Sequence, residues 1–154
     1  MRDVELMTEG LKDFLENNLG TYLTAIETDA ADSIDLGTPT FELGYKDIFG
    51  RNKYPAVLIV LDFVEQEESG AGSAWLSAHI DIVVAVTASS PDVLSKKLMR
   101  YMDAVYQLLG ESEDLGGVCL LSGFEGSDFL YGAPGAKDFG VVTISIKITN
   151  DILT

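Results

Sequence analysis

The sequence predicts a single α+β domain, in which an N-terminal helix and a central helix pack on one face of a mainly antiparallel β-sheet. Its 154 residues, of which 47% are hydrophobic, are enough for one domain core. Two segments have helical periodicity, and two pairs of strand-like segments are each close enough in sequence to form antiparallel hairpins. We therefore expect residues 1–154 to form one domain, with the order helix, short helix, strand, strand, helix, strand, strand.

The first predicted element is an amphipathic helix near the N-terminus. One side is formed by Val4, Met7, Leu11, Phe14, Leu15 and Asn18, and the charged side mostly by Glu5, Glu9, Lys12, Asp13 and Glu16. Residues 17–20 supply stop signals that end in a glycine. The pattern then predicts a separate short helix over residues 21–26, capped by Thr21.

Two long strands follow an acidic connector. Residues 29–47 are rich in Asp, Gly and Pro, which favours a connector with one strand around residues 40–43. Residues 56–64 are nearly all apolar, as expected of a strand in the centre of a sheet, and Pro55 marks its start. The next strand alternates: Leu76, Ala78, Ile80, Ile82, Val84 and Val86 point to the core, and Ser77, His79, Asp81 and Thr87 point mostly to solvent.

An acidic, glycine-bearing segment between these two strands predicts an extended hairpin loop. It consists of Glu65, Gln66, Glu67, Glu68, Ser69, Gly70, Ala71, Gly72 and Ser73. The two glycines loosen this segment, and its acids disfavour burial in the free subunit. We expect this candidate assembly loop to be mobile in the free subunit and to become ordered against a partner.

The central helix has the clearest start signal in the chain. Ser90 is its N-cap, Pro91 takes the first helical position, and Asp92 complements the positive end of the helix dipole. The core-facing stripe is formed by Leu94, Leu98, Tyr101, Met102, Val105, Leu108 and Leu109. Gly110 stops the helix.

The C-terminal part predicts the remaining strands. We expect a strand over residues 118–124, a short strand over residues 129–131, a turn at residues 132–135 and a last strand over residues 139–150. In the last strand Val142, Ile144, Ile146 and Ile148 alternate with polar residues, which is typical of a strand with one buried face.

The composition argues against several classes of function. The formal net charge is −15, from 25 acidic and 10 basic side chains, and it opposes binding to nucleic-acid phosphates. The single cysteine, Cys119, lies in an apolar run, which predicts a buried reduced thiol and no intrachain disulfide. The start of the chain is too acidic for a signal peptide, and no segment has the ~20 apolar residues of a membrane span. We expect a chain that is made in the cytoplasm and does not bind a membrane.

No residue pattern predicts a catalytic, cofactor or metal site. His79 is the only histidine and lies in mid-strand without a glycine-framed nucleophile, so we interpret it as a surface or interface residue. The acidic series Asp29, Asp32 and Asp35 lacks the spacing of a calcium loop. Many carboxylates could pair as glycoside hydrolysis needs, but most lie in runs beside Gly and Ser, which predicts solvated loops. Residues 132–137 lack the glycine spacing of a phosphate loop. The prediction is that the protein is not an enzyme.

Several segments together carry a family resemblance. They are the helix segment Leu11-Lys12-Asp13-Phe14-Leu15-Glu16, the turn Leu19-Gly20-Thr21-Tyr22-Leu23, the strand start Lys53-Tyr54-Pro55-Ala56-Val57-Leu58-Ile59, the long hairpin, the Ser90-Pro91-Asp92 helix and a closing hairpin. Through this pattern, which covers most of its length, the chain resembles the tail terminator and tail completion proteins of tailed phages, the group that includes the lambda-like tail terminators. Gly20 departs from the proline that many such sequences have there, which puts that turn in question.

The resemblance implies a structural virion protein without catalytic residues or cofactors. Its subunits close into a ring, commonly a hexamer, at the head-proximal end of the tail tube, where the ring stops tube polymerisation and forms the joint to the head. Its partners are then other copies of the chain, the tail tube protein and the head–tail connector protein. DNA passes through the lumen without specific binding, and the location is the tail or neck of the virion.

Some of the surplus carboxylates are candidates to line the lumen of such a ring. The candidate lumen acids are Asp29, Asp32, Asp35, Glu111, Glu113 and Asp114, together with the acids of the assembly loop. Like-charge repulsion would keep the duplex from adhering, over a Debye length of ~8 Å at ~0.15 M salt. The competing interpretation is that these acids only keep the outer surface soluble.

Two other functions remain open at this point. Another head–tail joining or baseplate protein of the same virion has a similar structural role, and the sequence pattern does not separate it from a terminator. An acidic DNA mimic that inhibits a nucleic-acid enzyme suits the net charge. Mimicry needs carboxylates in rows that imitate phosphates, however, and in this chain they cluster in loops.

Overall fold

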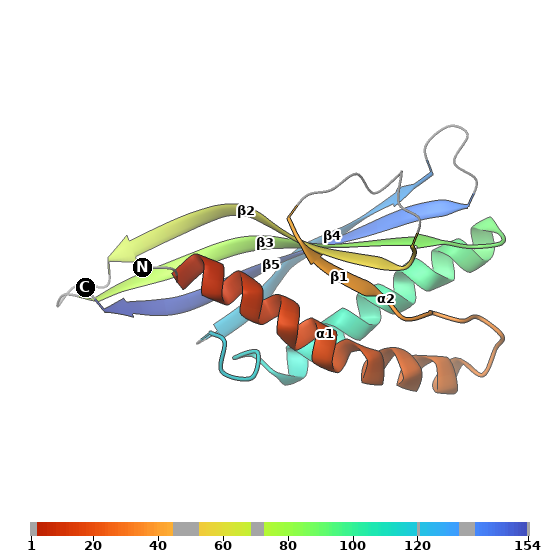
Figure 1. Ribbon diagram of the computed structural model, residues 1–154, viewed down its shortest axis with the longest axis horizontal. Helices are drawn as coiled ribbons and strands as arrows, with labels where there is room; N and C mark the ends of the chain where they lie inside the picture. Colours follow the sequence, from red (N-terminus) through yellow and green to blue (C-terminus); the bar gives the residue numbers. More distant parts are fainter. Residues whose placement is uncertain (1–2, 45–52, 69–72, 120, 133–137, 154) are drawn as a thin grey trace.

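The computed structural model describes residues 3–44, 53–68, 73–119, 121–132 and 138–153, and it confirms the α+β class. Two helices cross on one face of a five-stranded sheet, which gives a two-layer domain (Figure 1). The helices are α1 (Asp3–Ala30) and α2 (Pro91–Glu111). The strands are β1 (Thr40–Leu43), β2 (Ala56–Glu68), β3 (Ser73–Thr87), β4 (Leu121–Tyr131) and β5 (Phe139–Leu153).

The sheet is mainly antiparallel, as the sequence predicts. Its strand order is β1-β2-β3-β5-β4. β2 pairs with β3, β3 with β5 and β4 with β5, all antiparallel, so both predicted hairpins are present. The exception is β1, which lies parallel to the start of β2, with Thr40 beside Ala56 and Leu43 beside Ile59. The predicted strand around residues 40–43 is therefore confirmed, and it covers only the first part of the outer edge of β2.

The core lies between the helices and the sheet. Along α1 the buried side chains are four residues apart: Met7, Leu11, Leu15, Leu19 and Leu23. They pack with the apolar stripe of α2 and with inward-facing strand residues such as Ile82 and Ile144. Tyr101 of α2 is fully buried in this cluster, and its hydroxyl donates a hydrogen bond of 2.6 Å to the carbonyl of Leu36. This bond fixes the connector after α1 against α2.

The predicted break in the first helix is wrong. α1 runs without interruption from Asp3 to Ala30, so Gly20 lies inside it and Thr21 caps no second helix. A glycine in a helix interior costs about 1 kcal/mol relative to alanine. The apolar spacing continues past it through Leu19 and Leu23, and burial of these two side chains outweighs that cost. The amphipathic pattern, rather than the local stop signals, sets the length of this helix.

The start of α2 is confirmed in detail. Ser90 has an extended backbone and its hydroxyl accepts a hydrogen bond of 3.3 Å from the Val93 amide, as an N-cap does. Pro91 is the first helical residue, and the helix ends at Glu111, one residue beyond Gly110. No helix in the described part of the chain is long and apolar enough to cross a membrane.

The two strands predicted before the last turn are one strand. β4 begins at Leu121, so Val118 and Cys119 belong to the turn that follows α2, and it continues without a gap to Tyr131. A shift in register between Phe124 and Gly126 marks a bulge within it. β5 is confirmed and extends to Leu153. Of the predicted turn at residues 132–135, only Gly132 lies within the described residues.

Candidate functional site

The sheet face opposite the helices is the candidate functional surface, because neither helix packs on it (Figure 1). At the end near the start of β2 this face is covered, and a small apolar cluster of Leu58, Ala85, Phe139 and Val141 is buried there, each at most 5% exposed. Strand alternation and register place four large, exposed apolar side chains on the same face: Phe63, Trp75, Leu121 and Leu130, with exposed fractions between 38% and 55%. An apolar surface of this kind marks an interaction site more often than a catalytic one.

An ionic cluster centred on His79 lies in the middle of this open face. Its Nδ1 is 2.6 Å from Oε1 of Glu125 in β4, and its Nε2 is 3.2 Å from Oε2 of Glu65 in β2. The Phe63 ring stacks on the imidazole with centroids 3.9 Å apart. His79 itself belongs to β3, so the cluster joins three strands, and the residue is only 8% exposed. Of the two interpretations of His79, the exposed surface residue is wrong, and the interface residue stays a prediction.

The protonation of His79 depends on two opposing effects. Burial lowers the pKa of the imidazole, and the hydrogen bonds to Glu125 and Glu65 raise it by more, so the pKa lies above its usual 6.5. An imidazolium has two N–H donors and satisfies both carboxylates, whereas a neutral ring donates to only one of them. The cluster is therefore best satisfied when His79 carries a positive charge.

Polar pairs continue along the open face on both sides of His79. The Ser145 hydroxyl donates to Oδ1 of Asp81 at 2.8 Å, and the hydroxyls of Ser77 and Thr149 are 3.1 Å apart. Lys147 of β5 is the register partner of His79. The alternation of polar residues in β3 and β5 identifies this row in the sequence. The register that brings Glu125 to His79 is a tertiary feature, and the sequence pattern alone does not contain it.

Both outer edges of the sheet remain open among the described residues. β1 pairs only with Ala56–Ile59, so the outer edge of β2 from Val60 onward has no described strand beside it. β4 is the other outermost strand. Leu61 on β2 is 42% exposed and Leu130 on β4 is 55% exposed. Open edges with exposed apolar side chains are templates for pairing with another chain.

The candidate assembly loop is mostly not a loop. Glu65, Gln66, Glu67 and Glu68 continue β2 and pair with β3 as far as Glu68 beside Ala74, and Ser73 already begins β3. Residues 69–72 lie outside the described residues, so the prediction of mobility there stays a prediction. Backbone hydrogen bonds to β3 keep this acidic stretch extended although its side chains are polar. Strand pairing at the tip of a hairpin does not require a buried side-chain face.

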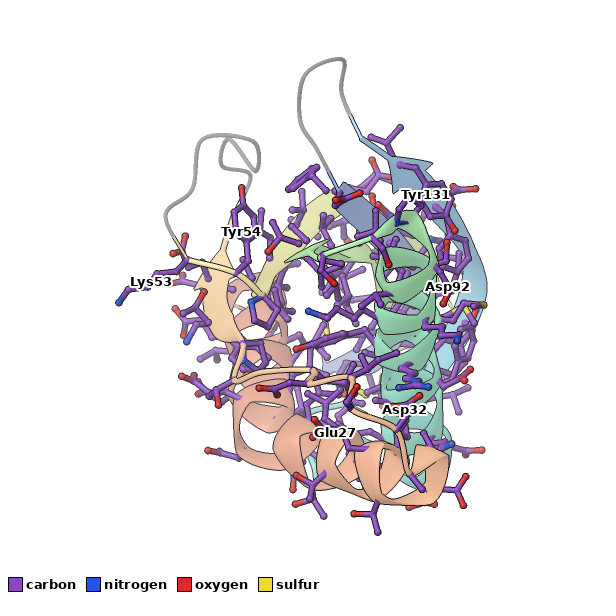
Figure 2. The ribbon with its side chains drawn as sticks, turned by 90° about the vertical axis from the view of Figure 1, so that its right-hand side faces the viewer. Glu27, Asp32, Lys53, Tyr54, Asp92 and Tyr131 are labelled. Carbon is purple, nitrogen blue, oxygen red and sulfur yellow. The ribbon has the colours of Figure 1, made fainter. Side chains whose placement is uncertain are left out.

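The candidate lumen acids do not form one group. Asp32 binds Arg100 through two hydrogen bonds of 2.6 and 3.0 Å, while Glu111 contacts the Tyr22 hydroxyl about three helical turns further along α2. Figure 2 shows Asp32 and Glu27 between the end of α1 and α2. The hydrogen bonds from Arg100 lower the pKa of Asp32 to about 2, so this carboxylate is held by a cation.

Two more of these acids have local structural roles. Asp35 accepts a hydrogen bond from the Gly37 amide at 2.8 Å, and Asp114 accepts one from the Gly116 amide at 3.1 Å. Such Asx contacts stabilise turns. Asp29 and Glu113 are exposed, and they retain the clearest claim to an electrostatic role on the surface.

Two hollows at the end of the domain far from the β2–β3 tip lack catalytic chemistry. One, of about 400 Å³, is lined mainly by Pro91, Leu94, Tyr131 and Phe139, and the other, of about 230 Å³, combines Asp35 and Lys97 with backbone and apolar groups. Neither lining set brings together a nucleophile, a base and an orienting group. Burial raises the pKa of the Cys119 thiol to about 11, which disfavours a reactive thiolate. In the described ranges no three His, Cys, Asp or Glu side chains are grouped to hold a metal ion.

Comparison with known proteins adds no assignment: no protein-family model matches the chain, and no curated protein sequence matches it significantly.

Proposed function

We propose that the chain is a structural subunit of a phage-type tail, which assembles head to tail into a ring at the head-proximal end of the tail tube. Six subunits is the number that the resemblance to tail terminators implies. The ring ends tube polymerisation and forms the joint to the head–tail connector. The observation that carries the proposal is the pair of open edges, β2 and β4, at opposite sides of a single sheet.

The strand directions are compatible with such an assembly. β2 and β5 run one way, and β3 and β4 run the other way. The free half of β2 is the part beyond its pairing with β1, residues 60–68. If this half from one subunit lies beside β4 of the next, the new pair is antiparallel and the alternation of strand directions continues. Each subunit then uses two different surfaces, which is the heterologous type of contact that forms a ring when the rotation between subunits closes.

The size of the open face also supports a stable contact. Four long strands at ~4.8 Å spacing and about eleven residues of ~3.3 Å rise span on the order of 700 Å², one end of which is already covered. A stable interface buries about 800 Å² on each partner, so a neighbouring subunit that pairs along an edge should also cover part of this face.

Within the proposed ring, we keep the lumen role for Asp29 and Glu113, which are exposed, and for Glu67 and Glu68 near the β2 tip. The remaining candidates bind groups within their own chain: Asp32, Asp35, Glu65, Glu111 and Asp114. Lysine substitutions in one group at a time test this. The expected result is slower DNA ejection with a changed salt dependence, in particles whose tails are complete; unchanged ejection for every group leaves solubility as their role.

A tube-length assay tests the proposed function. Purified chain added to polymerising tail tube protein should give tubes capped at one end and arrest their growth, as seen by negative-stain electron microscopy. Leu61→Lys on β2 or Leu130→Lys on β4 should abolish capping, because each puts a charge at an apolar edge contact.

A matched control separates assembly from folding. Met99→Lys changes a side chain that is 45% exposed but belongs to helix α2 and not to either edge strand, and it should cap tubes normally. All three substitutions are at exposed positions, so each should change the free energy of unfolding by no more than about 0.5 kcal/mol. Tubes that grow to the same length with and without the wild-type chain would contradict the proposed function.

A further inference from the structure

We propose that the bridge from Glu65 through His79 to Glu125 is a proton-dependent latch, which holds the free half of β2 and the edge strand β4 in the geometry that subunit contact requires. This inference deepens the proposed function and rests on it for its assembly step. The latch itself is a property of the single subunit and is tested there first.

The geometry singles out this bridge. Between Glu65 on β2 and Glu125 on β4 lie the two inner strands β3 and β5, so the imidazole connects the two outer parts of the sheet across its open face. Beyond Ile59, β2 has no described strand on its outer side, and β3 is the one described strand that pairs with its backbone. The side-chain bridge is therefore an additional restraint on the part of β2 that carries the open edge.

The aromatic stacking contact with Phe63 explains why the imidazole stays in place when its charge changes. Phe63 stacks on one face of His79, and the neighbouring strands limit exposure of the residue to 8%. Loss of the proton therefore leaves the ring between two carboxylates with only one N–H to share. One carboxylate then faces a nitrogen lone pair, and the contact becomes repulsive.

The other charges near His79 divide between the two signs. Lys147, the register partner of His79 on β5, disfavours a positive charge on the imidazole. Asp81, two residues away on β3, favours it. Asp62 lies at the bulge of β2 beside Phe63. The two directly bonded glutamates are closest, and they decide the sign: the bridge is strong while His79 is protonated and weakens as the pH rises through its elevated pKa.

The first experiment measures the latch within a single subunit, in Leu130→Lys, which should remain monomeric. Because the chain has one histidine, its imidazole resonances need no assignment, and their pH titration gives the pKa of His79 directly. We expect a value above 6.5 that falls in Glu125→Gln and is unchanged in Glu113→Gln, an exposed carboxylate outside the cluster. A value at or below 6.5 in the variant that keeps Glu65 and Glu125 overturns the latch.

Hydrogen exchange tests the effect on the strands. After correction for intrinsic rates, amides of β2 beyond Val60 and of β4 should lose about tenfold protection between pH 6 and pH 9, the consequence of losing one charge-assisted hydrogen bond. His79→Gln should remove this pH dependence. Equal protection at the two pH values overturns the latch even if His79 titrates as expected.

The assembly step has its own readout. The ring fraction, measured by mass photometry at fixed concentration, should fall at least about tenfold from pH 6 to pH 9 in the wild type and in Glu113→Gln. It should stay constant in His79→Gln. A wild type that forms rings equally at both pH values overturns the coupling, whereas a wild type that forms none at either pH contradicts the proposed function and leaves the monomer measurements to decide the latch.

Discussion

Replacement of Gly20 by alanine should stabilise the protein. This glycine lies inside α1, and a Cβ built on it meets no described atom within 4 Å. Alanine loses less backbone entropy than glycine on entering a helix, so Gly20→Ala should raise the free energy of unfolding by about 0.8–1.0 kcal/mol. In a domain of this size that corresponds to about 2–4 °C in Tm.

A second glycine in the same helix is the matched control. A Cβ on Gly10 would lie 2.8 Å from Cγ1 of Val118, closer than two carbon atoms approach without a shift. Overpacking of this kind costs about 1–3 kcal/mol, so Gly10→Ala should lose the helix-propensity gain or destabilise the protein. Gly10→Ala combined with Val118→Ala should recover part of the loss.

Urea denaturation followed by circular dichroism gives both free energies. The sign for Gly20 decides between two accounts of the helix. If the chain ended a helix at Gly20 with a left-handed backbone, as its local stop signals suggest, alanine would cost about 1 kcal/mol or more. A destabilised Gly20→Ala would therefore refute the continuous α1.

Two further predictions concern the connector between α1 and β1. Tyr101→Phe should lower the free energy of unfolding by about 1–3 kcal/mol, since it leaves the buried carbonyl of Leu36 without its donor, and unchanged urea denaturation would contradict this. Asp32 should titrate at about 2 in carboxyl NMR and nearer 3.8 in Arg100→Met. Because this pKa is lowered by folding, its contribution to stability is present above 3.8 and is lost as the pH falls toward 2; a wild-type value near 3.8 would exclude the ion pair in solution.

The sequence predicts the fold class because its strongest signals are periodic. Alternation over β3 and β5 and the capped start of α2 are each decided within a few residues, and both are confirmed. Local stop signals are less informative where side-chain burial or strand pairing favours continuation of the element. Gly20 does not end α1, and the acidic residues Glu65 and Glu67 do not end β2, because helix packing in one case and strand pairing in the other continue through them.

The candidate site is less accessible to sequence reasoning. His79 and Glu125 are 46 residues apart, and they meet only because β5 inserts between β3 and β4 and the bulge in β4 sets the register. The role of Asp32 depends in the same way on Arg100, 68 residues away. Periodicity places a residue on a face of the sheet, whereas its partner on that face depends on strand order, which local patterns do not specify.

Edge-mediated assembly is the central claim, and the mass of the purified chain in solution tests it most directly. Sedimentation velocity over a wide range of concentration at pH 6, with and without tail tube protein, should show one closed species with six times the mass of a single chain, and Leu130→Lys should remain monomeric. A wild-type chain that is monomeric in every condition would contradict the account, and so would a ring that Leu130→Lys forms equally well.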